Sequence, residues 1–258
     1  MKKGVTCLAK QLLLTAMGLF LTISMTMATP STIIWIPSVD FQGFKSWHLG
    51  FDNYIRMQKV NGVRGAGIFD MGVTTGVLPF KNVQAEVGVD YLSMGDNVYD
   101  DHPIYFNAKI GMPEGAMFEN SPAIAIGAYN FGLKSNLTNY NIIYGMIGKT
   151  LPVVGRLSVG YYTGHKKLLV EETGAKANSG IIASWDRTMT EISDKLWFAV
   201  DYQSGRNYLG ALNAGLSWSF SKNVSVIFAY NIYNNKQAFY NSVNTNANTF
   251  TAQIDINI

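Results

Sequence analysis

Histidine is the side chain most often used for proton transfer near neutral pH, and this chain has 3 of them: His48, His102 and His165. His48 lies four residues before Asp52, so on an extended strand both side chains point to the same face. A membrane-embedded hydrolase would also need a serine within reach of the histidine. No recognisable local serine motif accompanies His48. We therefore expect His48 to be a polar residue of a strand and expect no catalytic residue.

Asp100, Asp101 and His102 form a second group with chemical potential. Clustered oxygen ligands suit Ca²⁺, which makes a cation-binding loop one interpretation. A solvated acidic loop accounts for the same three residues and is the interpretation we favour. We expect no bound metal and no cofactor.

A larger set of charges is sorted by strand face. In the alternating strands described next, one face carries seven carboxylates and three basic side chains: Asp52, Asp70, Glu86, Asp90, Asp186, Asp201, Asp255, Arg56, Lys109 and Arg156. If this face lines a water-filled passage, the excess of carboxylates concentrates cations and excludes anions. The alternative is that the same groups pair with one another across a filled interior that passes nothing.

The elements that carry these charges are strands, because apolar and polar residues alternate with period two after residue 45. Clear examples are 83–91 and 250–258. No stretch after residue 28 has a convincing helical stripe. The pattern predicts twelve strands, at 46–58, 66–78, 82–92, 103–112, 121–131, 139–150, 155–164, 179–188, 194–203, 208–220, 223–234 and 248–258.

The connections between these strands fall into two classes. Tight ones (79–81, 151–154, 221–222) follow even-numbered strands. Longer polar ones follow odd-numbered strands, at 93–102, 132–138, 165–178 and 235–247. Short turns at one rim and long loops at the other are typical of outer-membrane barrels, whose rims also carry aromatic belts. We expect one belt to contain Tyr91, Tyr161, Tyr162, Tyr202, Tyr230 and Tyr233, and the other Phe80, Trp218 and Phe220.

The first 28 residues predict a cleaved signal peptide, with Lys2, Lys3 and Lys10 before an apolar run and small residues up to Ala28. The whole chain has 20 basic and 17 acidic residues. Removal of the three leader lysines leaves 17 of each, so the charge gives no reason to expect a nucleic-acid partner.

Residues 29–45 differ in character from the strands that follow. They contain the apolar run Ile33–Ile34–Trp35–Ile36–Pro37. We expect this segment to act as a plug in the lumen or as a periplasmic extension, and an added short strand is a third alternative. The residues assigned to the plug are Ile34, Trp35, Ile36 and Pro37.

Taken together, the leader, the alternating strands of about ten residues, the asymmetric connections and the hydrophobic last residue, Ile258, resemble a Gram-negative outer-membrane β-barrel of porin-like type. The resemblance covers 46–258 and is one of architecture. It implies an all-β fold, a single antiparallel up-and-down transmembrane β-barrel of about 12 strands, embedded in outer-membrane lipid.

The function that follows is a monomeric, narrow porin-like channel for a small solute, with weak cation preference. Two alternatives stay open. One is a structural barrel that docks a periplasmic or surface protein partner, and the other is a membrane-embedded hydrolase. The expected organisation is a signal peptide at 1–28, an N-terminal segment at 29–45 and the barrel at 46–258.

Overall fold

The computed structural model describes residues 31–59, 62, 64–235 and 248–258; the expected leader, 1–28, lies outside the described residues. The described chain forms twelve strands and one short helix, α2 (Asn97–Asp100). The strands are β1 (Trp47–Arg56), β2 (Ile68–Gly76), β3 (Gln84–Ser93), β4 (Ile104–Met112), β5 (Ala123–Gly132), β6 (Asn139–Leu151), β7 (Gly155–Thr163), β8 (Ser179–Thr188), β9 (Leu196–Gln203), β10 (Ala211–Ser219), β11 (Val224–Tyr233) and β12 (Thr249–Asn257).

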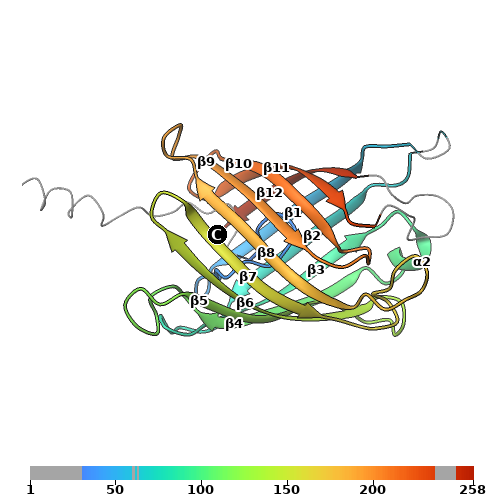
Figure 1. The fold of residues 1–258 in the computed structure, drawn as a ribbon, viewed down its shortest axis with the longest axis horizontal. Coiled ribbons are helices and arrows are strands. Elements are labelled where there is room, and N and C mark those ends of the chain that lie inside the picture. The colour runs from blue at the N-terminus through green and yellow to red at the C-terminus, as the bar shows by residue number, and fades with distance from the viewer. Residues whose placement is uncertain (1–30, 60–61, 63, 236–247) are drawn as a thin grey trace, which may run out of the picture.

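The strands close into one antiparallel barrel in which each strand pairs with its neighbours in the sequence (Figure 1). The ring is completed by β1 and β12, whose register runs from His48 opposite Asn257 to Arg56 opposite Thr249. Closure matters because each unpaired backbone group costs several kcal/mol in lipid, and a closed sheet has no free edge. The predicted all-β, twelve-stranded up-and-down barrel is confirmed.

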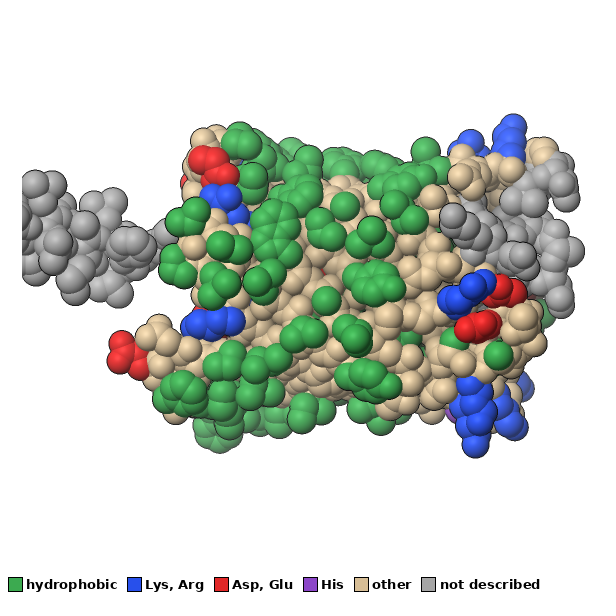
Figure 2. All heavy atoms as spheres, in the orientation of Figure 1, with side chains coloured by type: hydrophobic (Ala, Val, Ile, Leu, Met, Phe, Trp, Pro, Cys, Tyr) green, Lys and Arg blue, Asp and Glu red, His purple; other side chains and the backbone are tan. Residues whose placement is uncertain are grey.

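The outer surface of the barrel is apolar, while its interior holds polar side chains and an apolar cluster packed around residues 33–41. In β10 the burial alternates at every residue: Asn213 and Ser217 point inwards, while Leu212, Leu216 and Trp218 are exposed on the outer surface. Figure 2 shows this outer surface as hydrophobic along its middle, with Lys, Arg, Asp and Glu gathered at the two ends. An apolar band between charged rims is the surface that a bilayer requires.

The two ends of the barrel differ. The loop that carries α2 lies at one end, whereas the C-terminal residue Ile258 lies towards the other (Figure 1). The end near Ile258 carries the connections after even-numbered strands, including the tight turn 152–154 between β6 and β7. Within the described ranges, no helix is both long and apolar enough to cross a membrane.

The predicted aromatic belt is wrong at two positions. Tyr162 is fully buried inside the barrel, and Tyr233 lines an internal cavity. The reason is the period of the strand, because adjacent residues such as Tyr161 and Tyr162 must point to opposite faces. The other four members of that belt, Tyr91, Tyr161, Tyr202 and Tyr230, are exposed on the outer surface. The three members of the second belt, Phe80, Trp218 and Phe220, are exposed there as well.

Candidate functional site

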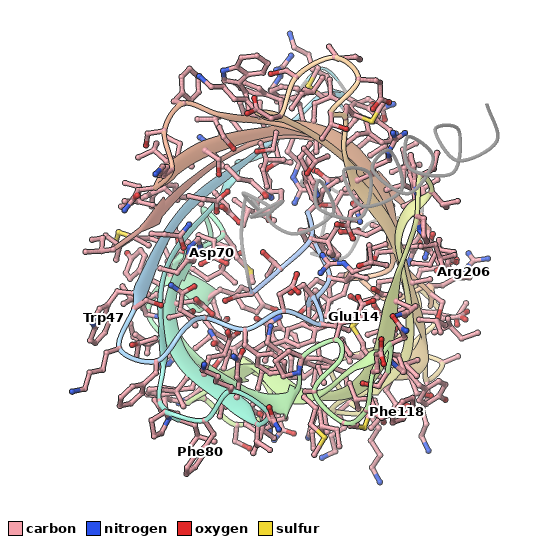
Figure 3. The ribbon with its side chains drawn as sticks, turned by 90° about the vertical axis from the view of Figure 1, so that its left-hand side faces the viewer. Trp47, Asp70, Phe80, Glu114, Phe118 and Arg206 are labelled. Atoms are coloured by element: carbon pink, nitrogen blue, oxygen red, sulfur yellow. The ribbon has the colours of Figure 1, made fainter. Side chains whose placement is uncertain are left out.

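Residues 31–44 run through the interior of the barrel. Figure 3 looks in from the short-turn end and shows this segment inside the ring of strands, with Asp70 pointing into the interior and Trp47 and Phe80 pointing outwards. A turn at Ile33–Ile36, closed by a 2.9 Å bond from the Ile33 amide to the Ile36 carbonyl, forms the tip of the segment. The apolar side chains of Ile33, Ile34 and Ile36 are at most 2% exposed, which removes them from water.

The first anchor of this segment is Asp201 on β9. One of its carboxylate oxygens, Oδ2, accepts the backbone N–H groups of Ile34 (2.8 Å), Trp35 (2.9 Å) and Ile36 (3.4 Å). The other oxygen, Oδ1, accepts the side-chain amide of Asn213 at 2.6 Å. A buried carboxylate needs such donors, because an unsatisfied charge in this position would be costly.

Behind Asp201 a row of polar side chains crosses the inner face of β10 to β12. Asn231 donates to Asn213 Oδ1 at 2.6 Å, and the Thr249 hydroxyl donates to Asn231 Oδ1 at 3.1 Å. Every bond in the row is donated towards Asp201. On β12, Gln253 adds a separate contact by donating to the Ile34 carbonyl at 2.9 Å.

The second anchor is the ion pair of Glu86 on β3 and Lys109 on β4, whose Oε1 and Nζ atoms are 3.1 Å apart. Glu86 Oε2 accepts the backbone N–H of Gln42 at 2.6 Å. Lys109 Nζ donates to the carbonyls of Ser31 and Ser38, each at 3.3 Å. Both charges are therefore paired with each other and with the backbone of the segment.

The third anchor joins β7, β8 and the segment. Arg156 donates to both carboxylate oxygens of Asp186, at 2.9 and 3.1 Å, and forms an ion pair with Asp40 of the segment. Trp197 Nε1 donates to Asp186 Oδ2 at 3.2 Å. A two-pronged Arg–carboxylate pair is a strong geometry, so Asp186 holds the Arg156 guanidinium in the position where it pairs with Asp40.

A cavity of about 840 Å³ remains between the segment and the barrel wall. It reaches from His48, near the start of β1, to Asp96 and Lys167 in the loops at the opposite end. Ile34, Trp35 and Pro37 of the segment form part of its wall.

One wall of this cavity is acidic. Asp52 and Asp70 occupy directly opposed positions on β1 and β2, and Asp90 on β3 pairs with Gly72, two residues farther along β2. Like charges directly opposite each other in a sheet are destabilising. Asp90 Oδ2 accepts from Asn107 at 2.7 Å, and Asp52 Oδ2 accepts from the Tyr54 hydroxyl at 3.3 Å.

The acidic wall continues onto β12. Asp255 lies 3.5 Å from His48 Nε2, while His48 Nδ1 is 3.2 Å from the side-chain oxygen of Asn257. The contacts of His48 are therefore those of a polar residue of the lumen.

The remaining wall is rich in aromatic rings. Trp35 packs edge-on against Tyr54 and Tyr233, with ring centroids 5.2 and 6.0 Å apart. Its Nε1 donates to the Leu209 carbonyl at 2.8 Å. Further rings on the wall come from β5, β6 and the loop after β9, and four of them form two contacting groups: Tyr129 with Tyr144, and Tyr140 with Tyr208.

The residues around α2 do not assemble a metal site. Asp100 accepts from the Met94 amide at 2.7 Å and from the Ser93 hydroxyl at 3.1 Å, so it stabilises the loop. Asp96 caps the helix by accepting from the Val98 amide at 2.9 Å. Throughout the part of the chain that the structure describes, no three His, Cys, Asp or Glu side chains are placed to hold a metal ion.

No family model matches the sequence, and no curated protein matches it. Among solved structures, the KdgM porin aligns with 81% of this chain and 98% of its own, at 9% sequence identity and a TM-score of 0.51. The chain has a porin-like barrel fold. The KdgM porin in complex with disordered oligogalacturonate gives the same shares, with 8% identity and a TM-score of 0.52.

All ten charged residues assigned to the lumen lie on the inner face of this porin-like barrel, in two groups. Seven line the cavity: Asp52, Arg56, Asp70, Glu86, Asp90, Lys109 and Asp255. The other three, Arg156, Asp186 and Asp201, are buried against the N-terminal segment or the residues that hold it. These three fit the alternative in which inner charges pair across a filled interior, because the segment covers them.

Sequence reasoning missed the small residues that make room for the segment. A Cβ on Gly148 would lie 2.7 Å from Val39, and one on Gly111 would lie 2.8 Å from the Phe41 ring. Glycine is needed where another segment of the same chain approaches a strand this closely. The signal was present in the sequence as glycines at inward positions, but only the location of the segment gives them a meaning.

Proposed function

We propose that the protein is a narrow, cation-preferring channel of the bacterial outer membrane, in which residues 31–44 constrict the passage. The observation that carries the proposal is the charge on the cavity wall. Six carboxylates line it, against three basic side chains: Asp52, Asp70, Glu86, Asp90, Asp96 and Asp255, against Arg56, Lys109 and Lys167. Low-dielectric walls focus this excess of negative charge into the passage.

The basic side chains on the wall do little to neutralise the acids. Lys109 is committed to Glu86 and to backbone carbonyls of the segment. Arg56 donates through Nε to the Ala66 carbonyl at 3.2 Å. The opposed pair Asp52 and Asp70 therefore keeps an excess of negative charge that a passing cation can balance.

The acidic wall also argues against assigning to this protein the ligand named with the KdgM porin. Oligogalacturonate, the ligand named with the KdgM porin, is the salt of an acidic sugar chain. An acidic wall repels such a polyanion, so we expect cationic or neutral small solutes here. We further propose that no catalytic step takes place, that residues 1–28 are removed on export, and that the barrel acts as a monomer.

The test is a planar-bilayer recording of the purified full chain across a KCl gradient. We expect a reversal potential of the sign that K⁺ selectivity gives. The double variant Asp52→Asn/Asp70→Asn should lower the K⁺/Cl⁻ permeability ratio, and Asp194→Asn, on an exposed turn outside the cavity, should leave it unchanged.

Anion selectivity would contradict the proposed role of the acidic wall. Absence of any conductance would contradict the channel itself and favour a structural barrel that docks a partner. Sequencing of the mature protein provides a separate check, since cleavage after Ala28 gives a chain that starts at Thr29.

A further inference from the structure

The cavity combines two kinds of wall that favour one class of ligand when they occur together. Carboxylates of β1, β2, β3 and β12 line one part, and aromatic rings of the segment, β5, β6 and the loop after β9 line the rest. The two parts meet where Tyr54, which donates to Asp52, also packs edge-on against Trp35. A ligand in the cavity therefore meets negative charge and aromatic rings at the same time.

Two of the carboxylates have an oxygen without a partner. Asp255 is 2% exposed, and its Oδ2 atom accepts no hydrogen bond. Oδ1 of Asp70 is also buried without a partner. Burying a carboxylate oxygen in this way is costly unless a cation or a donor reaches it. Both residues line the cavity, so a cation that enters it lies close to these carboxylates and offsets their negative charge without touching the buried oxygens.

Each wall alone would indicate a different ligand. Carboxylates alone would serve a small inorganic ion such as K⁺, which is held by oxygen ligands and water. Aromatic rings alone would serve a neutral solute that stacks on them. An organic ammonium ion uses both, since its charge pairs with carboxylates and its weakly hydrated surface lies against aromatic faces. The cavity volume of about 840 Å³ falls within the range of small-molecule sites.

We propose that this cavity is a binding chamber for small organic cations of the ammonium type, which are the preferred solutes of the channel. The proposal rests on the proposed channel function and adds the substrate class to it. Asp70 and Asp255 pair with the charge, and the aromatic wall, which is tested at Tyr144, binds the apolar part. Through Trp35, the N-terminal segment forms part of the wall of this chamber.

The test uses choline and its neutral analogue 3,3-dimethyl-1-butanol, which have the same shape and differ in charge. We expect choline to reduce K⁺ current through the reconstituted full chain at concentrations where the neutral analogue has no effect. Asp70→Asn should weaken the effect of choline about tenfold, as expected for a lost contact to a charged group. Asp194→Asn, outside the chamber, should leave it unchanged.

The aromatic wall is tested separately. Tyr144→Leu should weaken the effect of choline about threefold or more, and Tyr144→Phe should retain it, because the ring remains. Tyr161→Leu is the matched control, since Tyr161 is 57% exposed on the outer surface. Equal losses in Tyr144→Phe and Tyr144→Leu would overturn the role of the ring.

The outcomes separate this proposal from the channel function. A K⁺-selective conductance that choline and the neutral analogue affect equally would overturn the chamber and leave the channel standing. If no conductance is found, calorimetric titration of choline into the detergent-solubilised full chain still tests the chamber. Saturable binding that Asp70→Asn weakens would then support it, and absence of binding would overturn it.

Discussion

Replacing Asp201 with asparagine should release the N-terminal segment while changing the size of the side chain very little. In the native protein Asp201 Oδ2 accepts two short bonds from the amides of Ile34 and Trp35, at 2.8 and 2.9 Å. The asparagine has no charge to strengthen these bonds. Its amide group must also face either those backbone donors or the side-chain amide of Asn213, which already donates to Asp201 Oδ1.

The magnitude follows from the two short bonds. A hydrogen bond to a charged group contributes about 1.5–3 kcal/mol, against about 0.5–1.5 kcal/mol for a neutral pair, so each bond loses about 1 kcal/mol. Asp201 is 1% exposed, which means that solvent does not screen its charge. The docked segment should therefore lose about 2 kcal/mol, which raises the undocked population about 30-fold.

Thiol labelling measures that population directly. The chain has 1 cysteine, Cys7, which lies in the expected leader, so Ser38→Cys provides a single reporter in the mature protein. Ser38 is fully buried when the segment is docked. Maleimide labelling of Ser38→Cys should become about 30-fold faster on addition of Asp201→Asn, following the change of about 2 kcal/mol. Asp194→Asn on the same background should not change the rate.

An unchanged labelling rate in the Asp201→Asn variant would refute the reasoning, because it would show that the three amide contacts do not hold the segment. Faster labelling in both variants would point to a general loosening of the barrel instead. Parallel bilayer recordings should show a larger mean conductance for Asp201→Asn if the released segment is the constriction.

Three further outcomes are expected. Gly148→Ala should destabilise docking of the segment by about 1–3 kcal/mol through overpacking, measured by the same labelling assay, whereas Gly145→Ala, with nothing within 4 Å of the new Cβ, should not. Burial opposes ionisation of Glu114, but hydrogen bonds from Lys149 and Thr150 outweigh it and lower the pKa of Glu114. The ion pair therefore stabilises the fold above the unfolded pKa of about 4.3, and this stabilisation is lost as the pH falls through the lower folded pKa. The loss should be less than about 1 kcal/mol, because the pair is partly exposed. In a thermal unfolding series from pH 6 to pH 3, the melting temperature should fall with pH by an amount that Glu114→Gln lacks. Arg156→Met should cost about 3–5 kcal/mol in urea unfolding, because it leaves buried Asp186 and partly buried Asp40 without their cationic partner. A loss below about 1 kcal/mol would show that other groups compensate the two carboxylates.

The fold could be predicted from the sequence because its cause is local. Side chains of a strand alternate between two faces, so the alternating run 83–91 predicts both a strand and which of its side chains point into the barrel. The same rule placed Asp52, Asp70 and Asp90 on the inner face. It was misapplied to Tyr162, which is adjacent to the outward-facing Tyr161 and so must point inwards.

The partners of the inner charges could not be predicted, because they are backbone groups far away in the sequence. Asp201 contacts Ile34, which is 167 positions away in the sequence. Gln253 also contacts Ile34, from 219 positions away. Alternation shows that Asp201 faces inwards, but it carries no information about what fills the interior. For the same reason the inward glycine at position 148 could be read only once Val39 was located beside it.

The distribution of the anchors has a consequence for the order of assembly. Residues 31–44 leave the ribosome before any strand, whereas Asp201 belongs to β9 and Gln253 belongs to β12, the last strand to be made. The segment cannot dock fully until the final strand has closed the ring onto β1. Until then the apolar turn at Ile33–Ile36 has no core to enter. Burial of residue 38 is therefore a late event and can serve as a reporter of barrel closure.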